Sequence, residues 1–228
     1  MKTLFSKQNL YFIIIFTILG FLALQVPVTQ LAGSKAKFTL FDAFGPIAGS
    51  FIGTVPGVIA VFLMQLFNFL VHGANVLDVG TIIRFFPSLF AVAYFSRKSK
   101  LGIIVPLIAI VVFNVNPIGR SVWYFSLYWL IPIVCHVLRS HSLLARSLGA
   151  TFTAHAVGGA LWIWAFALPK AVWISLIPVI AMERALFTLG IVTAYVTITN
   201  VLGYCIRAKI VHLSFTIEQQ YLLRGFRA

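Results

Sequence analysis

Apolar runs of membrane-spanning length follow one another along almost the whole chain, and charged residues are confined mainly to the short segments between them. Only 9% of the 228 residues are charged, too few to cover the surface of a soluble domain of this size. A run of about 20 apolar residues forms a helix long enough to cross a bilayer. The sequence therefore predicts an all-α integral membrane protein, a bundle of about six to eight transmembrane helices. The expected spans are 9–29, 39–54, 56–73, 80–96, 101–117, 121–138, 145–167 and 172–205.

The second and third spans are short, and residues 53–57 (GTVPG) join them. Two full crossings and one re-entrant hairpin are both compatible with this pattern, and both give the same orientation to the later spans. We expect residues 1–206 to form a single transmembrane domain. Residues 207–228 mix apolar and charged side chains and are expected to form an amphipathic cytoplasmic tail.

Basic residues between the spans are distributed unequally, and this sets the orientation, because cytoplasmic loops carry an excess of Lys and Arg. With the N-terminus inside, eleven basic residues face the cytoplasm and four face outward. The eleven are Lys2, Lys7, Arg97, Lys98, Lys100, Arg139, Arg146, Arg207, Lys209, Arg224 and Arg227, and the four are Lys35, Lys37, Arg120 and Lys170. Both chain ends are therefore expected in the cytoplasm of a bacterial or archaeal cell. This distribution explains the net charge of +13 by contact with the lipid bilayer, and no nucleic-acid partner is expected.

Four glycines recur at four-residue spacing: Gly45, Gly49, Gly53 and Gly57. Small residues at this spacing let helix backbones approach closely in a membrane, where no hydrophobic effect drives helices together. We interpret the four glycines as a helix-packing surface. A sliding surface between parts that move is the alternative.

Ionisable residues inside a membrane are costly and need a partner or a function. The proposed orientation gathers several polar and aromatic residues in the outer half of the bundle. We expect them to line an outward-opening cavity that binds a small organic molecule: Arg84, Asn116, His155, Trp164, Glu183 and Arg184. The alternative is internal ion pairing, for example of Asp42 with Arg84, which would hold the bundle together without binding anything.

Enzyme motifs are scarce in this chain. It has no GxSxG, no HExxH, no P-loop and no cysteine pair at metal-binding spacing. We therefore expect no catalytic residues, no cofactor and no metal site. A membrane enzyme acting on lipid, with Glu183 and His155 as acid and base, is kept as an alternative.

Residues 38–49 (FTLFDAFGPIAG), continuing to Gln65-Leu66-Phe67-Asn68, resemble the early helices of S components, the substrate-binding membrane subunits of energy-coupling-factor (ECF) vitamin transporters. The segment from Arg84 to Lys100 and the proline-led residues 177–184 (IPVIAMER) are also similar. Most such subunits have six spans, so 121–138 and 145–167 would be additional here. The first helix offers only Gly20 and Ala23 where the family carries an Ala-x-x-x-Ala strip.

The resemblance implies that the chain captures a small vitamin-like molecule at the outer face of the membrane. It also implies partners, namely a transmembrane coupling subunit and cytoplasmic ATPases that drive the whole subunit to topple. The alternative is a non-enzymatic scaffold of cell-envelope or cell-shape assembly, similar to MreD. A polar cavity open to the outside favours transport, whereas a solid bundle with paired charges favours a scaffold.

Overall fold

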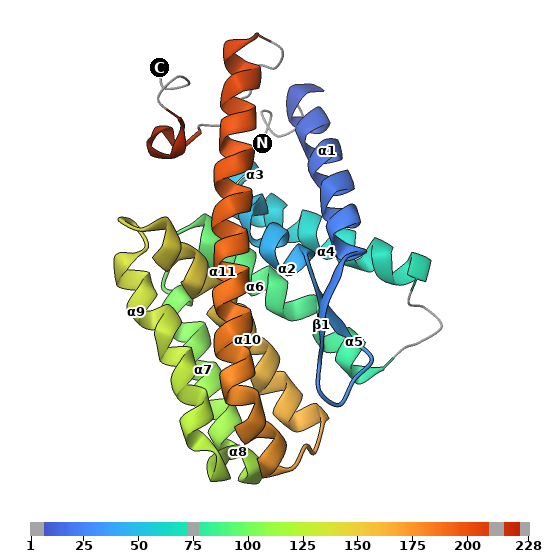
Figure 1. The fold of residues 1–228 in the computed structure, drawn as a ribbon, viewed down its shortest axis with the longest axis vertical. Coiled ribbons are helices and arrows are strands. Elements are labelled where there is room, and N and C mark those ends of the chain that lie inside the picture. Colours follow the sequence, from blue (N-terminus) through green and yellow to red (C-terminus); the bar gives the residue numbers. More distant parts are fainter. Residues whose placement is uncertain (1–6, 73–77, 210–216, 224–228) are drawn as a thin grey trace.

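The computed structural model describes residues 7–72, 78–209 and 217–223, and most of them are helical (Figure 1). The longer helices are α1 (Lys7–Leu24), α4 (Thr54–His72), α6 (Phe85–Ser96), α7 (Leu101–Val115), α10 (Leu143–Ala165) and α11 (Lys170–Arg207). The shorter helices are α2 (Phe41–Phe44), α3 (Ala48–Ile52), α5 (Val79–Ile83), α8 (Pro117–Ser121) and α9 (Ile131–Leu138). Three further segments form 3-10 helices: η1 (Gly45–Ile47), η2 (Trp123–Leu130) and η3 (Gln219–Tyr221).

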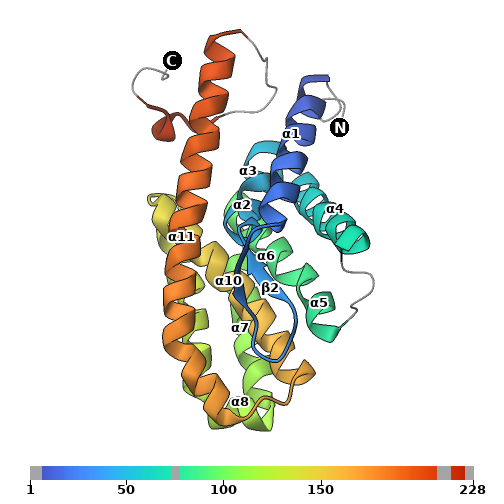
Figure 2. The same cartoon turned by 45° about the vertical axis from the view of Figure 1, so that its right-hand side comes forward.

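Helix α10 lies at the centre of the bundle and packs against α6, α7, α9 and α11. Helix α1 and the second half of α11 extend beyond the other helices at one end, and α8 lies at the opposite end (Figures 1 and 2). The first turn of α1 and the last turn of α11 therefore lie at the same end of the molecule. This arrangement agrees with a chain whose two ends share one side of a membrane.

The helices occur within a few residues of the predicted spans, but several are short or interrupted. Within the described residues, three helical segments are long and apolar enough to cross a membrane: α4, the α5–α6 segment (Val79–Ser96) and α11. These three indicate a membrane protein, and shorter apolar helical segments lie at Ile14–Leu24, Leu101–Val115 and Trp123–Leu138. Helix α7 has only 15 residues, and α10 carries Arg146 and His155 among its apolar residues.

The first arm of the glycine-containing hairpin is a broken helix. Residues 41–52 are divided among α2, η1 and α3, and twelve residues reach only about 18 Å against a hydrocarbon thickness of about 30 Å. The chain reverses at Gly53, whose φ of 92° is accessible to glycine at little cost. Residues 41–72 therefore have the geometry of a hairpin with one short arm, not of two full crossings.

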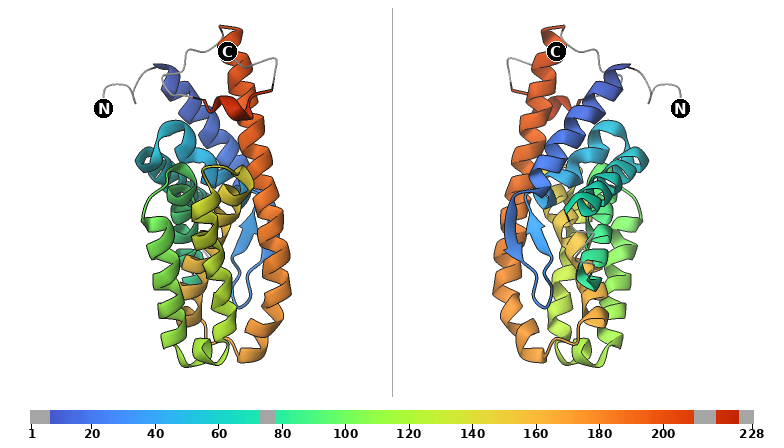
Figure 3. Two further views of the ribbon diagram at one scale, coloured as in Figure 1. Left: turned by 90° about the vertical axis from the view of Figure 1, so that its left-hand side faces the viewer. Right: turned by 90° about the vertical axis from the view of Figure 1, so that its right-hand side faces the viewer.

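A two-stranded antiparallel hairpin follows α1, so the prediction of an all-α chain was wrong in this segment. Strand β1 (Pro27–Gln30) pairs with β2 (Lys37–Thr39), and Gly33 in the turn has a φ of 80°. The hairpin runs beside α11 (Figure 3), and the indole nitrogen of Trp162 in α10 donates to the Ala32 carbonyl at 2.9 Å. The turn is thus fixed against the helical bundle.

Asp78 ties the hairpin turn to the start of α5. Its carboxylate accepts hydrogen bonds from the Thr81 hydroxyl and backbone nitrogen, at 2.5 and 2.6 Å, and from the Ser34 hydroxyl at 2.7 Å. The Thr81 hydroxyl and these other donors lower the pKa of Asp78 to about 2, because each of them stabilises the ionised carboxylate. An aspartate in this position both caps a helix and holds the hairpin.

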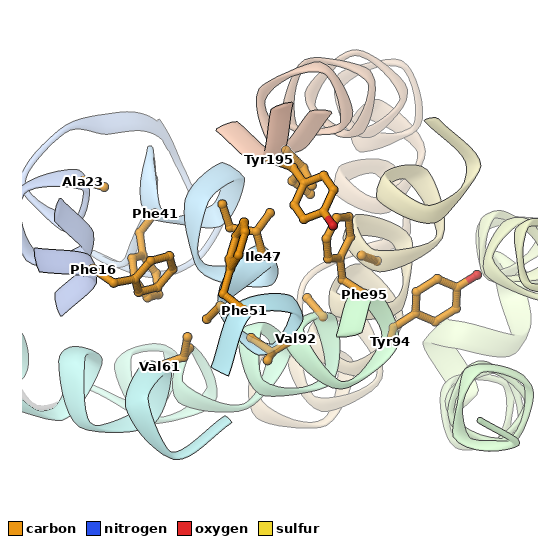
Figure 4. Packing of buried hydrophobic residues seen from close by; sticks show 14 of the residues in the cluster. Phe16, Ala23, Phe41, Ile47, Phe51, Val61, Val92, Tyr94, Phe95 and Tyr195 are labelled. Carbon is orange, nitrogen blue, oxygen red and sulfur yellow. The ribbon is translucent and has the colours of Figure 1, made fainter. Parts of the chain in front are cut away.

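Two clusters of buried side chains form the core. The first joins α1, the 41–52 segment, α4, α6 and α11; in it Phe51, Phe95 and Tyr195 lie together (Figure 4). The second lies at the α8 end and is rich in aromatic rings, with Phe113 and Phe125 packed against Trp129 and Trp173. The candidate site lies at the border of this aromatic cluster.

The four glycines do not form a strip on one helix. Gly45 lies in η1, Gly49 in α3, Gly53 at the reversal and Gly57 in α4. A Cβ atom on Gly57 would lie 2.5 Å from the Cα of Gly49, so these two backbones touch. The glycines therefore serve the packing of α3 against α4 within the hairpin.

Candidate ligand site

A cavity of about 120 Å³ lies between the hairpin and helices α6, α10 and α11. Four of the six residues expected at a ligand site line it: Arg84, His155, Glu183 and Arg184. Helix α11 supplies the last two from consecutive positions, and α10 supplies His155. The hairpin supplies one wall through Gln30 to Ala32 and Phe38.

Arg84 and Asp42 form an ion pair at the hairpin side of the cavity. One terminal nitrogen of Arg84 lies 2.8 Å from Asp42 Oδ2 and 3.1 Å from Oδ1. Asp42 also accepts the backbone N–H of Thr39 at 2.8 Å, which fixes the end of β2. The expected alternative of an Asp42–Arg84 pair is therefore present, and both of its members also line the cavity.

Phe38 connects the two guanidinium groups of the site. The central carbon of Arg84 lies 4.7 Å from the ring centroid of Phe38, and that of Arg184 lies 4.5 Å from it. A cation this close to an aromatic face is stabilised by the ring quadrupole. The hairpin residue Phe38 thus helps to hold both cations beside the cavity.

Glu183 is held by the hairpin more closely than by its neighbour Arg184. The Thr29 hydroxyl donates to Glu183 Oε1 at 2.6 Å, whereas Arg184 approaches Oε2 only to 3.4 Å. Both residues are almost fully buried, with exposed fractions of 7% and 2%. The Glu183–Arg184 contact is therefore long for a charge-assisted hydrogen bond, which normally spans about 2.7–2.9 Å.

Arg184 lacks the partners that a buried guanidinium requires. Its only other side-chain hydrogen bond in the described part of the chain is to Thr151 Oγ1, also at 3.4 Å, and its Nε has no acceptor there. Native proteins pair nearly all buried polar groups, because an unmade hydrogen bond costs about 1–3 kcal/mol. Arg184 therefore has two long contacts, an unpaired Nε and hydrogen-bonding capacity that the described residues do not use.

Two more residues that carry N–H donors line the same cavity, Trp173 and His155. Trp173 is 2% exposed, and its Nε1 has no acceptor within the described residues. The indole nitrogen of Trp129 donates to His155 Nδ1 at 3.0 Å, so the neutral imidazole carries its hydrogen on Nε2. Trp173, His155 and Arg184 all line the cavity, and two of them, Trp173 and Arg184, carry an unpaired buried N–H.

The structure does not bring Asn116 and Trp164 to this cavity. Asn116 caps α8, where its Oδ1 accepts the backbone N–H of Ile118 at 2.9 Å and its amide nitrogen reaches the Ile163 carbonyl. Trp164 is 56% exposed, and its indole nitrogen donates to the Val112 carbonyl in α7. Both residues lie near the expected end of their helices but have structural partners of their own.

The expected list of site residues did not include three contributors: Trp173, Phe38 and Thr29. The place of Trp173 near the outer end of a predicted span indicates the aromatic belt at the membrane surface, but the side chain is buried. Phe38 and Thr29 lie on the hairpin, which was not predicted. The available signal was a glycine–serine turn between two short segments containing β-branched and aromatic residues.

A metal centre has no ligand set in the described part of the chain. Within residues 7–72, 78–209 and 217–223, no three His, Cys, Asp or Glu side chains gather closely enough to hold an ion. The residues around the cavity supply N–H donors, aromatic faces and two ion pairs.

Comparison with known proteins gives one distant relative. The chain is 24% identical to an uncharacterized protein of Methanocaldococcus jannaschii, MJ0923, over 209 residues that cover 82% of this chain and 70% of the archaeal one. No family model matches the sequence, and no solved structure matches it. The similarity covers most of this chain, and the name of the relative states no activity.

Proposed function

We propose that the protein is the substrate-binding membrane subunit of an ECF-type transporter that takes up a small vitamin-like molecule. The observation that carries this proposal is the set of buried, unpaired donors around one cavity. A purely structural bundle gains nothing from leaving Arg184 Nε and Trp173 Nε1 without acceptors, because each unmade bond destabilises the fold. A ligand that supplies acceptors would satisfy them.

The charges of the cavity suggest what kind of ligand it takes. Each carboxylate already faces a guanidinium, Asp42 with Arg84 and Glu183 with Arg184. The ligand is therefore uncharged or zwitterionic, and it offers hydrogen-bond acceptors to the donors that remain. The aromatic walls favour a flat ring. An engineered cavity of about 150 Å³ holds one benzene, so about 120 Å³ suits a single small ring.

Energy coupling in this proposal comes from other chains. The sequence has no nucleotide-binding motif, and the resemblance to S components assigns energy coupling to a transmembrane coupling subunit and cytoplasmic ATPases. The bound molecule enters from the side of the hairpin, and the bundle lies in a bacterial or archaeal plasma membrane.

The proposal is tested by purifying the full chain in mild detergent and identifying co-purifying small molecules by mass spectrometry. Glu183→Gln and Arg184→Gln are compared with the matched control Trp164→Phe, which changes a residue outside the cavity. We expect the first two variants to fold and to lose the bound molecule, while the control retains it. Retention of the molecule by both site variants would refute the proposal.

A membrane scaffold similar to MreD is the second candidate, and the close Asp42–Arg84 pair favours it. On this hypothesis the buried charges only hold the bundle together. Glu183→Gln and Arg184→Gln would then each unfold the protein, and the double substitution would restore stability. No small molecule would co-purify with the wild-type chain.

A further inference from the structure

A second cavity, of about 230 Å³, borders the first core cluster, where the α6–α7 turn, the α9–α10 turn and the C-terminal segment meet. We call it the basic cavity. Its walls are formed by Ser96, Lys98, Arg139, Ser140, Arg146, Glu218, Gln220 and Tyr221. Three cations thus face one carboxylate. This site shares no residue with the candidate ligand site.

Glu218 neutralises one of the three cations. Its Oε1 accepts hydrogen bonds from Arg146 Nη1 at 2.7 Å and from the Tyr195 hydroxyl at 2.9 Å. Its Oε2 accepts from the Gln220 amide at 3.1 Å. Because Glu218 is occupied by these partners, it cannot also neutralise Lys98 and Arg139, and the cavity keeps an excess of positive charge.

Two hydrogen bonds to backbone carbonyls hold the Arg139 side chain and leave some of its N–H groups unused. Its Nη1 and Nη2 each donate to a backbone carbonyl at the end of α6, that of Arg97 at 2.9 Å and that of Phe95 at 3.0 Å. Its guanidinium lies 5.0 Å from the ring centroid of Tyr94. Each terminal nitrogen carries two hydrogens, so these two bonds leave further N–H groups on Arg139.

The positive excess is unfavourable in the absence of an anion. Burial and repulsion from Arg146 lower the pKa of Arg139 to about 10, because both disfavour the charged form of its guanidinium. Lys98 is exposed and forms no salt bridge with any residue of the described segments 7–72, 78–209 and 217–223. An oxyanion placed among Lys98, Arg139 and the Ser140 hydroxyl would offset the repulsion at Arg139 and give Lys98 an anionic partner.

A phosphate group has the chemistry that these residues recognise. The planar guanidinium fork binds tetrahedral oxyanions through paired hydrogen bonds, and a lysine adds a point charge. Basic cavities between membrane helices at the end of the apolar layer are typical sites for phospholipid head groups. We propose that the basic cavity binds a phosphate group, carried by an anionic phospholipid or by a soluble phosphate compound.

The test uses the full-length protein in a neutral detergent and follows its thermal unfolding. Phosphatidylglycerol is compared with phosphatidylcholine as added lipid, and inorganic phosphate is compared with chloride at equal ionic strength. We expect one of the two phosphate probes to raise the Tm in a concentration-dependent manner, because a ligand of the folded state stabilises it. A response to phosphatidylglycerol assigns a lipid, and a response to inorganic phosphate assigns a soluble compound.

Lys98→Gln and Lys100→Gln form a matched pair for this test. Both lysines lie in the α6–α7 turn and are exposed, but only Lys98 lines the basic cavity. We expect Lys98→Gln to weaken the affinity for the active probe by about fivefold, as for one charge near a phosphate surface. Lys100→Gln should leave it unchanged. Equal weakening by both variants, or no Tm response to either phosphate probe, would overturn the proposal.

Discussion

Trp173→Phe isolates the unpaired indole N–H that marks the candidate ligand site. The substitution keeps an aromatic ring in contact with Phe113 and Phe125, whose centroids lie 5.2 and 4.9 Å from that of Trp173. It removes only the second ring and its buried donor. Trp129→Phe is the matched comparison, because Trp129 is equally buried but donates its N–H to His155.

Trp173→Phe and Trp129→Phe should change the free energy of unfolding by different amounts. Removing an unpaired buried donor relieves about 1–3 kcal/mol, which offsets the packing lost with the smaller ring. Trp173→Phe should therefore change the free energy of unfolding by less than about 1 kcal/mol. Trp129→Phe loses similar packing and also leaves His155 Nδ1 without its donor, so it should be at least about 2 kcal/mol less stable than Trp173→Phe. In a chain of this length that difference corresponds to about 4–8 °C in Tm.

Trp173→Phe, the variant expected to lose less stability, should lose more ligand affinity. In Trp173→Phe a ligand acceptor would face a phenyl ring and lose a buried hydrogen bond worth about 1–3 kcal/mol, so the ligand should bind about 5- to 150-fold more weakly to this variant than to the wild type. Thermal unfolding in detergent, with and without the molecule that co-purifies with the wild type, measures both effects. If the two substitutions lower the Tm equally and Trp173→Phe retains the ligand, the unpaired donors are not ligand groups.

Three more predictions concern the framework around the site. Gly57→Leu should destabilise the protein by about 1–3 kcal/mol because the α3 backbone leaves no room for a side chain, whereas Gly158→Ala, whose Cβ would meet Pro87 only at 3.4 Å, should be tolerated; thermal unfolding compares them. The stability that ionised Asp78 contributes should be present above its ordinary pKa of 3.8 and be lost as the pH falls toward 2, so the Tm difference between wild type and Asp78→Asn should shrink over that range. Glu218→Gln should release residues 217–223 from Arg146, and faster amide exchange at Leu223 would show it, while unchanged exchange would contradict the assigned role of the ion pair.

The positions of the helices could be predicted because long apolar runs in the sequence indicate membrane helices. The helix that lies at the centre of the bundle could not. Helix α10 spans 23 residues, yet Arg146, His155 and two threonines make it less apolar than a lipid-exposed span. Those residues are tolerated because α10 lies at the centre of the bundle and its neighbours supply partners. Only the three-dimensional arrangement reveals which helix is central.

Part of the candidate site could also be predicted, since Arg84, His155, Glu183 and Arg184 are costly in an apolar span and lie together in the structure. The prediction failed where a polar or aromatic side chain has a local role. Asn116 caps a helix, and this role depends on Pro117 starting a short helix immediately after it. Residues 210–216 and 224–228 of the predicted amphipathic tail lie outside the described residues, and the part between them docks through Glu218 instead of continuing α11.

Helix α11 contacts two distant regions of the molecule, the cavity and the C-terminal segment. Arg184 contacts the cavity near the hairpin, and Asn200, about 24 Å further along the helix, bonds to the Tyr221 carbonyl and the Leu223 amide of the C-terminal segment. A tilt of about 10° about Arg184 moves Asn200 by about 4 Å, more than a hydrogen bond can stretch. Any change at the cavity that tilts α11 as a rigid rod must therefore carry the C-terminal segment along or release it.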